Sequence, residues 1–187
     1  TDTWRDLAGD EHDAFFAVAG AKGSLLSELR EAVTKAITEG QRPEEFQSRF
    51  EEISQGWAHT GDKAWRAGII YGTNLSASYG RGREQYQFDP EVLRLLPYLQ
   101  FQHSDSSRPR PLHRALDQQV FRADECPFSL PNGYGCACRY VSLSQRDLDG
   151  LGLSVSTLKR GDTVPVEGED GQRSTETLEP APGWDRR

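Results

Sequence analysis

Apolar residues recur at helical spacing through the first part of the chain. Leu25, Leu29, Val33, Ala36 and Ile37 share one face of a predicted helix. Ser24 is its expected N-cap and Gly40 its C-terminal stop. The preceding residues, 1–23, have an irregular or only weakly helical pattern.

A second helix is predicted after a short turn. Pro43 suits its first turn, and its apolar stripe is Phe46, Phe50, Ile53 and Trp57. Because the connection is so short, the two helices are expected to pack as an antiparallel hairpin.

A longer helix is predicted over residues 62–87. It contains recurring small residues: Gly68, Gly72, Ala77, Ser78 and Gly80. Since each glycine costs about 1 kcal/mol in a helix, we expect these positions to pack closely against another backbone. Asp89-Pro90-Glu91 marks the start of a further short helix, and Pro97 marks its end.

The second half is predicted to be a loop-rich β region. Strands are expected at 98–103, 119–122 and 138–143, separated by proline and glycine turns. Ser144 and Asp147 have capping-box spacing for a helix near 145–150. Residues 160–187 suit either one hairpin or an arm that needs a partner. The pattern predicts an α+β fold with a helical part (1–97), a β region (98–155) and a C-terminal arm (156–187).

Charge and composition narrow the function classes. The net charge is −7, yet residues 66–143 hold nine arginines against seven carboxylates. This overall acidity argues against a dedicated nucleic-acid-binding protein, but it allows a local arginine contact. No apolar run reaches the roughly 20 residues of a membrane helix, so no membrane partner is expected. The chain starts at Thr1 and has no methionine, which favours a segment of a longer product.

Four potential metal ligands fall within residues 108–140: His113, Cys126, Cys136 and Cys138. Three cysteines and one histidine form a known structural zinc set. The same residues also suit buried free thiols and a hydrogen-bonded histidine. A catalytic Cys–His pair would further need an orienting group and an oxyanion site, and the sequence identifies neither.

A second group consists of arginines: Arg81, Arg83, Arg108, Arg110 and Arg114. The planar guanidinium suits phosphate and carboxylate recognition, so this group predicts contact with DNA or with an acidic partner. The alternative is a solvated face with internal salt bridges.

Two segments resemble the phage head morphogenesis proteins of the Mu F-like class. The first is WRAGIIYGTNLSASYGRGREQYQF (residues 65–88), with an Arg, a Thr-Asn pair, a Ser-Tyr and a Gly-Arg. The second is RPRPLHRALDQQVFRADECPFSLPNGYGCACRY (108–140), with Arg-Pro, the His, Val-Phe, Pro-x-Gly and Cys-x-Cys. PAPGWD (180–185) is similar to the closing segment of the family. The matching positions are Arg66, Thr73, Asn74, Tyr79, Arg83, Arg108, His113, Gly133, Cys136 and Cys138.

The resemblance implies a minor head protein of a tailed phage or prophage. Such a protein is a structural, non-enzymatic adaptor near the portal, inside the capsid or at the portal vertex, and in the host cytoplasm during assembly. Its implied partners are the portal, other head proteins and, through local arginines, packaged DNA. Cys126 is not a family position, so a zinc ion would take its fourth ligand from His103 or water. Ala137 replaces the usual arginine, which weakens the nearby basic contact.

Two other functions remain open on the sequence. One is a phage-delivered effector or toxin, a nuclease or an ADP-ribosyltransferase, carried by a longer parent chain. The other is a DNA-binding module centred on the middle arginines, whose affinity would depend on salt.

Overall fold

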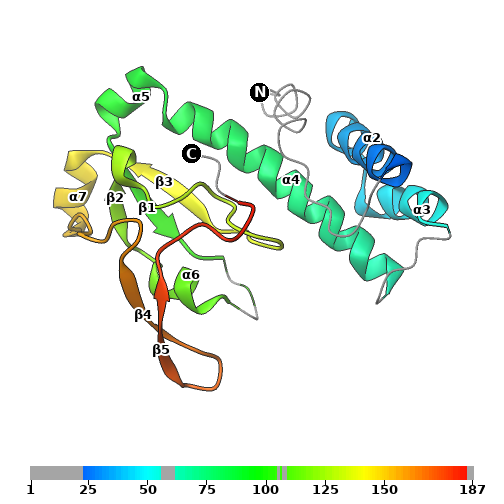
Figure 1. Ribbon diagram of the computed structural model, residues 1–187. Helices are drawn as coiled ribbons and strands as arrows, with labels where there is room; N and C mark the ends of the chain where they lie inside the picture. The colour runs from blue at the N-terminus through cyan, green and yellow to red at the C-terminus, as the bar shows by residue number, and fades with distance from the viewer. Residues whose placement is uncertain (1–22, 56–61, 105, 107–108, 185–187) are drawn as a thin grey trace. The chain divides into compact units, whose positions relative to one another are not determined.

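The computed structural model describes residues 23–55, 62–104, 106 and 109–184. Contacts within the chain group it into two units, residues 1–83 and residues 84–187. Helices fill the first unit, and two small antiparallel sheets with short helices make up the second (Figure 1). The α+β prediction is therefore confirmed, while the part boundaries at residues 97 and 155 stay a prediction.

The described residues of the first unit contain α2 (Ser24–Glu39), α3 (Pro43–Ile53) and the beginning of α4 (Lys63–Gln87). Helices α2 and α3 contact each other, as the short connection predicts. Their apolar stripes and one face of α4 form a buried cluster of Leu29, Val33, Ala36, Ile37, Phe46, Phe50, Ala67 and Ile70. Trp57, expected on the same stripe, lies outside the described residues.

The two ends of α2 test the capping predictions. Gly40 follows the helix in the left-handed conformation, with φ 65°, and its N–H donates to the carbonyls of Ala36 and Ile37, as expected of a C-cap. The N-cap prediction is wrong by one residue, because Gly23 is the cap and Ser24 is the first helical residue. Gly23 has φ 61°, a conformation that glycine adopts readily, so the chain turns into the helix there.

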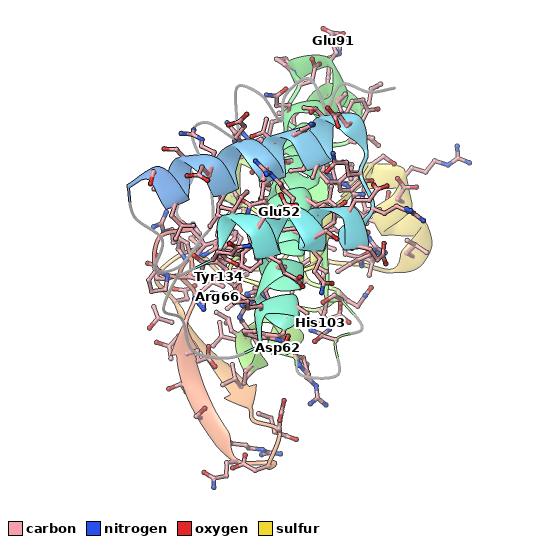
Figure 2. The ribbon with its side chains drawn as sticks, turned by 90° about the vertical axis from the view of Figure 1, so that its right-hand side faces the viewer. Glu52, Asp62, Arg66, Glu91, His103 and Tyr134 are labelled. Atoms are coloured by element: carbon pink, nitrogen blue, oxygen red, sulfur yellow. The ribbon has the colours of Figure 1, made fainter. Side chains whose placement is uncertain are left out.

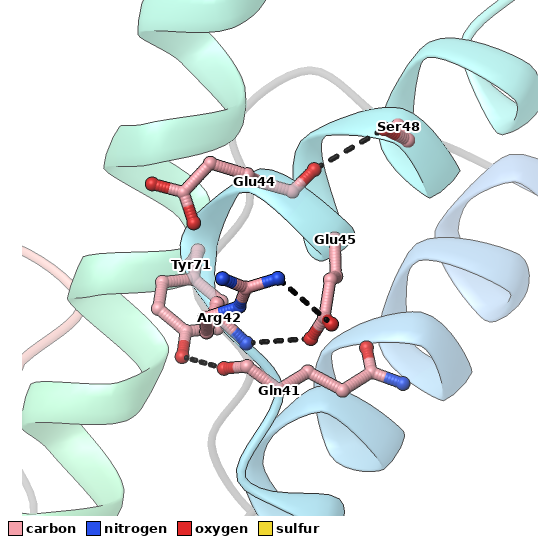
Figure 3. A network of polar contacts seen from close by, with 6 residues as sticks. All are labelled: Gln41, Arg42, Glu44, Glu45, Ser48 and Tyr71. Atoms are coloured by element: carbon pink, nitrogen blue, oxygen red, sulfur yellow. Dashed lines mark hydrogen bonds and ion pairs between the residues drawn. The ribbon is translucent and has the colours of Figure 1, made fainter.

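The turn between α2 and α3 is connected to α4 by one hydrogen bond and by a ring contact (Figure 3). The Tyr71 hydroxyl donates to the Gln41 carbonyl at 2.7 Å. The Arg42 main-chain N–H donates to Glu45 Oε2 at 2.9 Å, which closes the first turn of α3. The Phe46 ring lies 5.3 Å from the Tyr71 ring. These contacts fix the hairpin against α4.

Two of the predicted small residues of α4, Gly68 and Gly72, do not pack as expected, whereas Ala77 and Ser78 are buried. A Cβ atom added at Gly68 or Gly72 would meet no described atom within 4 Å, so close packing does not explain these two glycines. Gly68 is exposed and Gly72 is half-buried. The buried face of this helix instead carries small or polar side chains such as Ala77 and Asn74, whose Nδ2 donates to the Ile70 carbonyl at 2.8 Å.

The second unit contains a three-stranded antiparallel sheet with the order β2-β1-β3. The strands are β1 (Tyr98–Gln102), β2 (Val120–Arg122) and β3 (Arg139–Leu143), within one residue of the predicted limits. Helix α5 (Pro90–Leu95) precedes the sheet, and its Glu91 side chain points away from the ribbon (Figure 2). Helix α6 (Pro111–Ala115) lies between β1 and β2 in the chain, and a 3₁₀ turn (Ala123–Glu125) lies between β2 and β3.

The C-terminal part contributes one helix and one hairpin. Helix α7 (Gln145–Leu151) begins with the predicted capping box of Ser144 and Asp147. Strands β4 (Thr163–Glu167) and β5 (Arg173–Thr177) form the predicted hairpin. Val164, Val166 and Leu178 belong to the same buried cluster as Leu99 and Phe101 of the sheet. None of the described helices has the length and hydropathy needed to cross a bilayer.

Candidate metal centre

His113 occupies the middle of α6, a helix of only five residues that starts at Pro111. Its side chain is buried between two aromatic residues. The Phe101 ring meets the imidazole edge-on at 6.0 Å, and the Phe128 ring lies 6.0 Å away at 30°. The imidazole is therefore held by the core of the second unit and does not face solvent.

Cys136 and Cys138 lie where the loop after Phe128 enters β3. The main-chain N–H of Cys136 donates to the Gly133 carbonyl at 3.2 Å, which turns the loop. Ala137 between them is exposed, whereas the two cysteines are 4% and 7% exposed. This alternation places both thiols on the buried side.

The three side chains meet at one point. Nδ1 of His113 lies 3.7 Å from Sγ of Cys136 and 3.6 Å from Sγ of Cys138. All three donor atoms lie within 4.8 Å of one another. For Zn–S and Zn–N bonds of about 2.3 and 2.0–2.1 Å at a tetrahedral angle, the N···S separation is about 3.6 Å. The observed separations therefore fit a single zinc ion.

The donor chemistry also fits zinc. Two thiolates and an imidazole nitrogen suit a borderline-soft ion, and a set without carboxylates does not suit calcium or magnesium. Zinc held in this way supplies folding energy by cross-linking its ligands. The group joins α6 to the loop before β3, two segments that are also connected by hydrogen bonds from Arg110.

The two thiols share their ionisation. The hydrogen bond from Cys138 lowers the pKa of Cys136 to about 4; burial opposes this shift, and the hydrogen bond from His113 adds to it. The same Cys136–Cys138 contact raises the pKa of Cys138, and burial raises it further. The contact thus favours the thiolate form of Cys136 and the thiol form of Cys138.

Asn132 and Arg110 hold the loop that carries the two cysteines. Asn132 is buried, and its Nδ2 lies 3.5 Å from Nε2 of His113. The Arg110 guanidinium donates to the carbonyls of Asn132 (3.3 Å) and Tyr134 (2.6 Å). Gly133 has φ 112°, and a Cβ there would lie 2.8 Å from Arg110 Nη2. Only glycine fits this position without strain.

The structure does not bring the fourth predicted ligand into the group. Cys126 is half-buried, and its sulfur lies 3.6 Å from the Arg122 carbonyl. His103, the alternative, follows β1 and donates its main-chain N–H to Asp117 Oδ1 at 2.8 Å (side chain labelled in Figure 2). Neither residue is among the convergent donors of the described chain.

The predicted arginines are divided between the two units, with Arg81 and Arg83 in the first and Arg110 and Arg114 in the second, and their joint contact with a partner stays a prediction. Arg110 is engaged with the loop, and Arg83 lies over the Tyr79 ring at 5.0 Å and donates to the Tyr79 hydroxyl. Arg114 is exposed and lines a groove between α6 and the β4–β5 hairpin, together with Glu167 and Arg173. Arg108 lies outside the described residues. Arg81 is half-buried in α4.

The remaining family positions lie on α4. Thr73 and Asn74 are buried, Arg66 is half-buried and Tyr79 is half exposed. The Asn74 side chain donates a hydrogen bond to the Ile70 carbonyl one turn earlier in α4. This bond explains why an amide is tolerated at a buried position. In the sequence, Asn132 is marked only by the Asn-Gly dipeptide, which predicts a turn and not a partner for histidine.

The geometry favours metal binding over nucleophilic catalysis. Cys136, His113 and Asn132 have the residue types of a thiol nucleophile, its base and an orienting amide. All three are buried, however, so a substrate cannot reach the sulfur in this conformation. A buried cross-linking group is what the arrangement provides.

A comparison with protein families then identifies the class. Residues 27–141, more than half of the chain, match the family described as Phage Mu protein F like protein. This region includes the whole of α4 and the His–Cys–Cys group. The chain belongs to the phage Mu F-like family.

Two relatives extend the match along most of the chain. One, named capsid assembly protein F, comes from Escherichia phage Mu; it is 32% identical over 173 residues, covering 82% of this chain and 39% of the relative. The other is the Mu-like prophage FluMu F protein of Haemophilus influenzae, 28% identical over 170 residues, covering 82% of this chain and 41% of the relative. The chain thus spans about two fifths of the length of these relatives. No solved structure matches it.

Proposed function

We propose that this chain is a structural part of a phage capsid assembly protein. The observation that carries the proposal is the Mu F-like match, together with a relative named for capsid assembly. Deleting the gene from an inducible phage or prophage, and restoring it in trans, tests the proposal. The expected result is loss of mature heads on deletion and their return on complementation. Normal heads after deletion would contradict it.

The proposed role is non-catalytic. It is supported by the burial of the His–Cys–Cys group, which suits cross-linking of the fold better than access by a substrate. The alternative, an effector or toxin, would rest on a further domain of a longer parent chain. Reading the parent frame beyond Arg187 distinguishes the two, because a nuclease or ADP-ribosyltransferase motif there would favour the effector.

We place the protein beside the portal, as the family resemblance implies, either inside the capsid or at its portal vertex. The expected partners are the portal and other head proteins. Co-purification with the tagged portal from induced cells is the direct test, and a portal preparation free of this protein would contradict the placement. A contact with packaged DNA is the weaker part of the proposal, because Arg83 and Arg110 already have partners within the chain.

Within this role, His113, Cys136 and Cys138 hold a zinc ion that stabilises the second unit. The support is the match between the observed N···S separations, 3.6 and 3.7 Å, and the tetrahedral value. A water molecule or a residue outside the convergent group would complete the coordination. Elemental analysis and variants of the ligands test the site.

A further inference from the structure

Asn132 connects the proposed metal centre to the C-terminal segment, residues 178–184. Its side chain is 2% exposed and has partners on both sides. Oδ1 accepts a hydrogen bond from the Ala181 N–H at 2.7 Å, while Nδ2 lies 3.5 Å from Nε2 of His113. One amide group thus contacts both the imidazole and the C-terminal segment.

The short bond to Ala181 fixes the orientation of the amide. Because an N–H donor requires an acceptor, the atom facing Ala181 must be the oxygen, and the NH₂ group must face His113. The imidazole then accepts at Nε2 and carries its proton on Nδ1, where the two sulfurs lie. In this arrangement Nε2 faces a donor and Nδ1–H faces the two sulfurs when no metal is bound.

A metal ion at this centre changes the requirement on Nε2. The ion takes the lone pair of Nδ1, so the neutral imidazole carries its proton on Nε2. That N–H would face the NH₂ group of Asn132, and two donors cannot bond to each other. Rotating the amide by half a turn offers its oxygen to His113 but withdraws it from Ala181.

We infer that Asn132 couples metal binding to the attachment of the C-terminal segment. Zinc at His113, Cys136 and Cys138 breaks the hydrogen bond from the Ala181 N–H to Asn132 Oδ1, which we call the Ala181 anchor. The inference rests on the proposed zinc centre and adds its regulation. The anchor matters because Pro180 and Pro182 have no N–H, so Ala181 has the single main-chain donor of that tripeptide. Beyond it, Trp184 packs edge-on against Tyr134 with ring centroids 5.5 Å apart.

Amide hydrogen exchange of the whole chain, followed by NMR with and without one equivalent of Zn²⁺, tests the coupling. The Leu178 N–H, which donates to the Asp162 carbonyl at 2.8 Å, is the internal control. Zinc is expected to slow exchange at Leu178, because it stabilises the unit, and to speed exchange at Ala181 by about threefold to tenfold. Stoichiometric zinc binding with slowed or unchanged exchange at Ala181 would overturn the inference.

Two variants at the same position separate coupling from a purely structural role. In Asn132→Asp the two carboxylate oxygens can accept from both Nε2–H and Ala181. We expect zinc to bind about tenfold tighter than in the wild type, and exchange at Ala181 not to accelerate. In Asn132→Ala, exchange at Ala181 should be fast with or without zinc. Affinity of Asn132→Asp equal to or below that of the wild type would overturn the inference, and a wild-type chain that binds no zinc would overturn the metal centre as well.

Discussion

Nδ1 of His113 lies 3.6 Å from Sγ of Cys138, although 25 residues separate them in the chain. The histidine comes from a short helix and the cysteine from the residue just before β3, so the contact closes a long loop. Within this loop, β2 pairs with β1, and the Arg110 guanidinium donates to the carbonyls of Asn132 and Tyr134. A zinc ion at this point would add a direct cross-link between α6 and the segment that leads into β3.

Replacing Cys138 is expected to abolish zinc binding. Serine preserves the size of the side chain but is a poor zinc ligand, so Cys138→Ser should lose the bound metal and lower the melting temperature of the second unit. Cys126→Ser is the matched control, because the Cys126 sulfur lies outside the donor group. Isothermal titration with Zn²⁺ measures both variants. Equal zinc affinity in Cys138→Ser and wild type would contradict the assignment.

Chelation should destabilise one unit selectively. When free zinc stands at 100 times its dissociation constant, binding adds about 2.7 kcal/mol to the free energy of unfolding. Removing the metal with a chelator is expected to take away that amount from residues 84–187 and to leave the helical unit unchanged. Fluorescence and circular dichroism during urea unfolding separate the two transitions. A parallel loss in both units would show that the effect is not local to the centre.

Tyr71→Phe should weaken the first unit. The hydroxyl donates to the Gln41 carbonyl at 2.7 Å, so its removal is expected to cost about 1 kcal/mol of unfolding free energy. Burial, followed by the charges of Glu44 and Glu45, raises the pKa of this phenol. Because the folded state disfavours the phenolate, its contribution is complete below the ordinary pKa of about 10 and is lost as pH rises through the raised value. Urea unfolding at several pH values measures the free energy of unfolding and its pH dependence. Tyr86→Phe, at an exposed position, is the control and should change neither of them.

The stability of the first turn of α7 should decrease at acidic pH. The Ser144 side chain, followed by its main chain, lowers the pKa of Asp147 by hydrogen bonding to the carboxylate. The contribution of this group is therefore complete above the ordinary carboxyl pKa and is lost as pH falls through the lowered value. NMR titration of the α7 amides checks this, with Asp147→Asn as the variant whose α7 amides should not follow that ionisation. Identical titration of both proteins would contradict the capping role.

Much of the fold follows from local pattern. The apolar stripe of α2, Pro43 at the start of α3 and the Ser144–Asp147 box are each specified by neighbouring residues, and the structure agrees. Gly68 and Gly72 show the limit of such reasoning, because a small residue in a helix signals close packing only when another element covers it. Burial of that kind depends on the whole fold.

The candidate centre was only partly predictable for the same reason. Residue type pointed to His113 and the three cysteines, and the Cys-x-Cys alternation places two thiols on one side of an extended chain. Local sequence could not show that Cys126 turns toward the Arg122 carbonyl. It also could not show that Asn132 meets His113, because that contact depends on how two loops fold together.

The zinc content of the full chain, purified without added metal, decides whether His113, Cys136 and Cys138 hold a metal ion. Elemental analysis of wild type beside the variant that replaces both Cys136 and Cys138 with serine is the measurement. We expect about one zinc per chain in the wild type and none in the double variant. A folded wild-type protein without zinc, or zinc retained by the double variant, would contradict it.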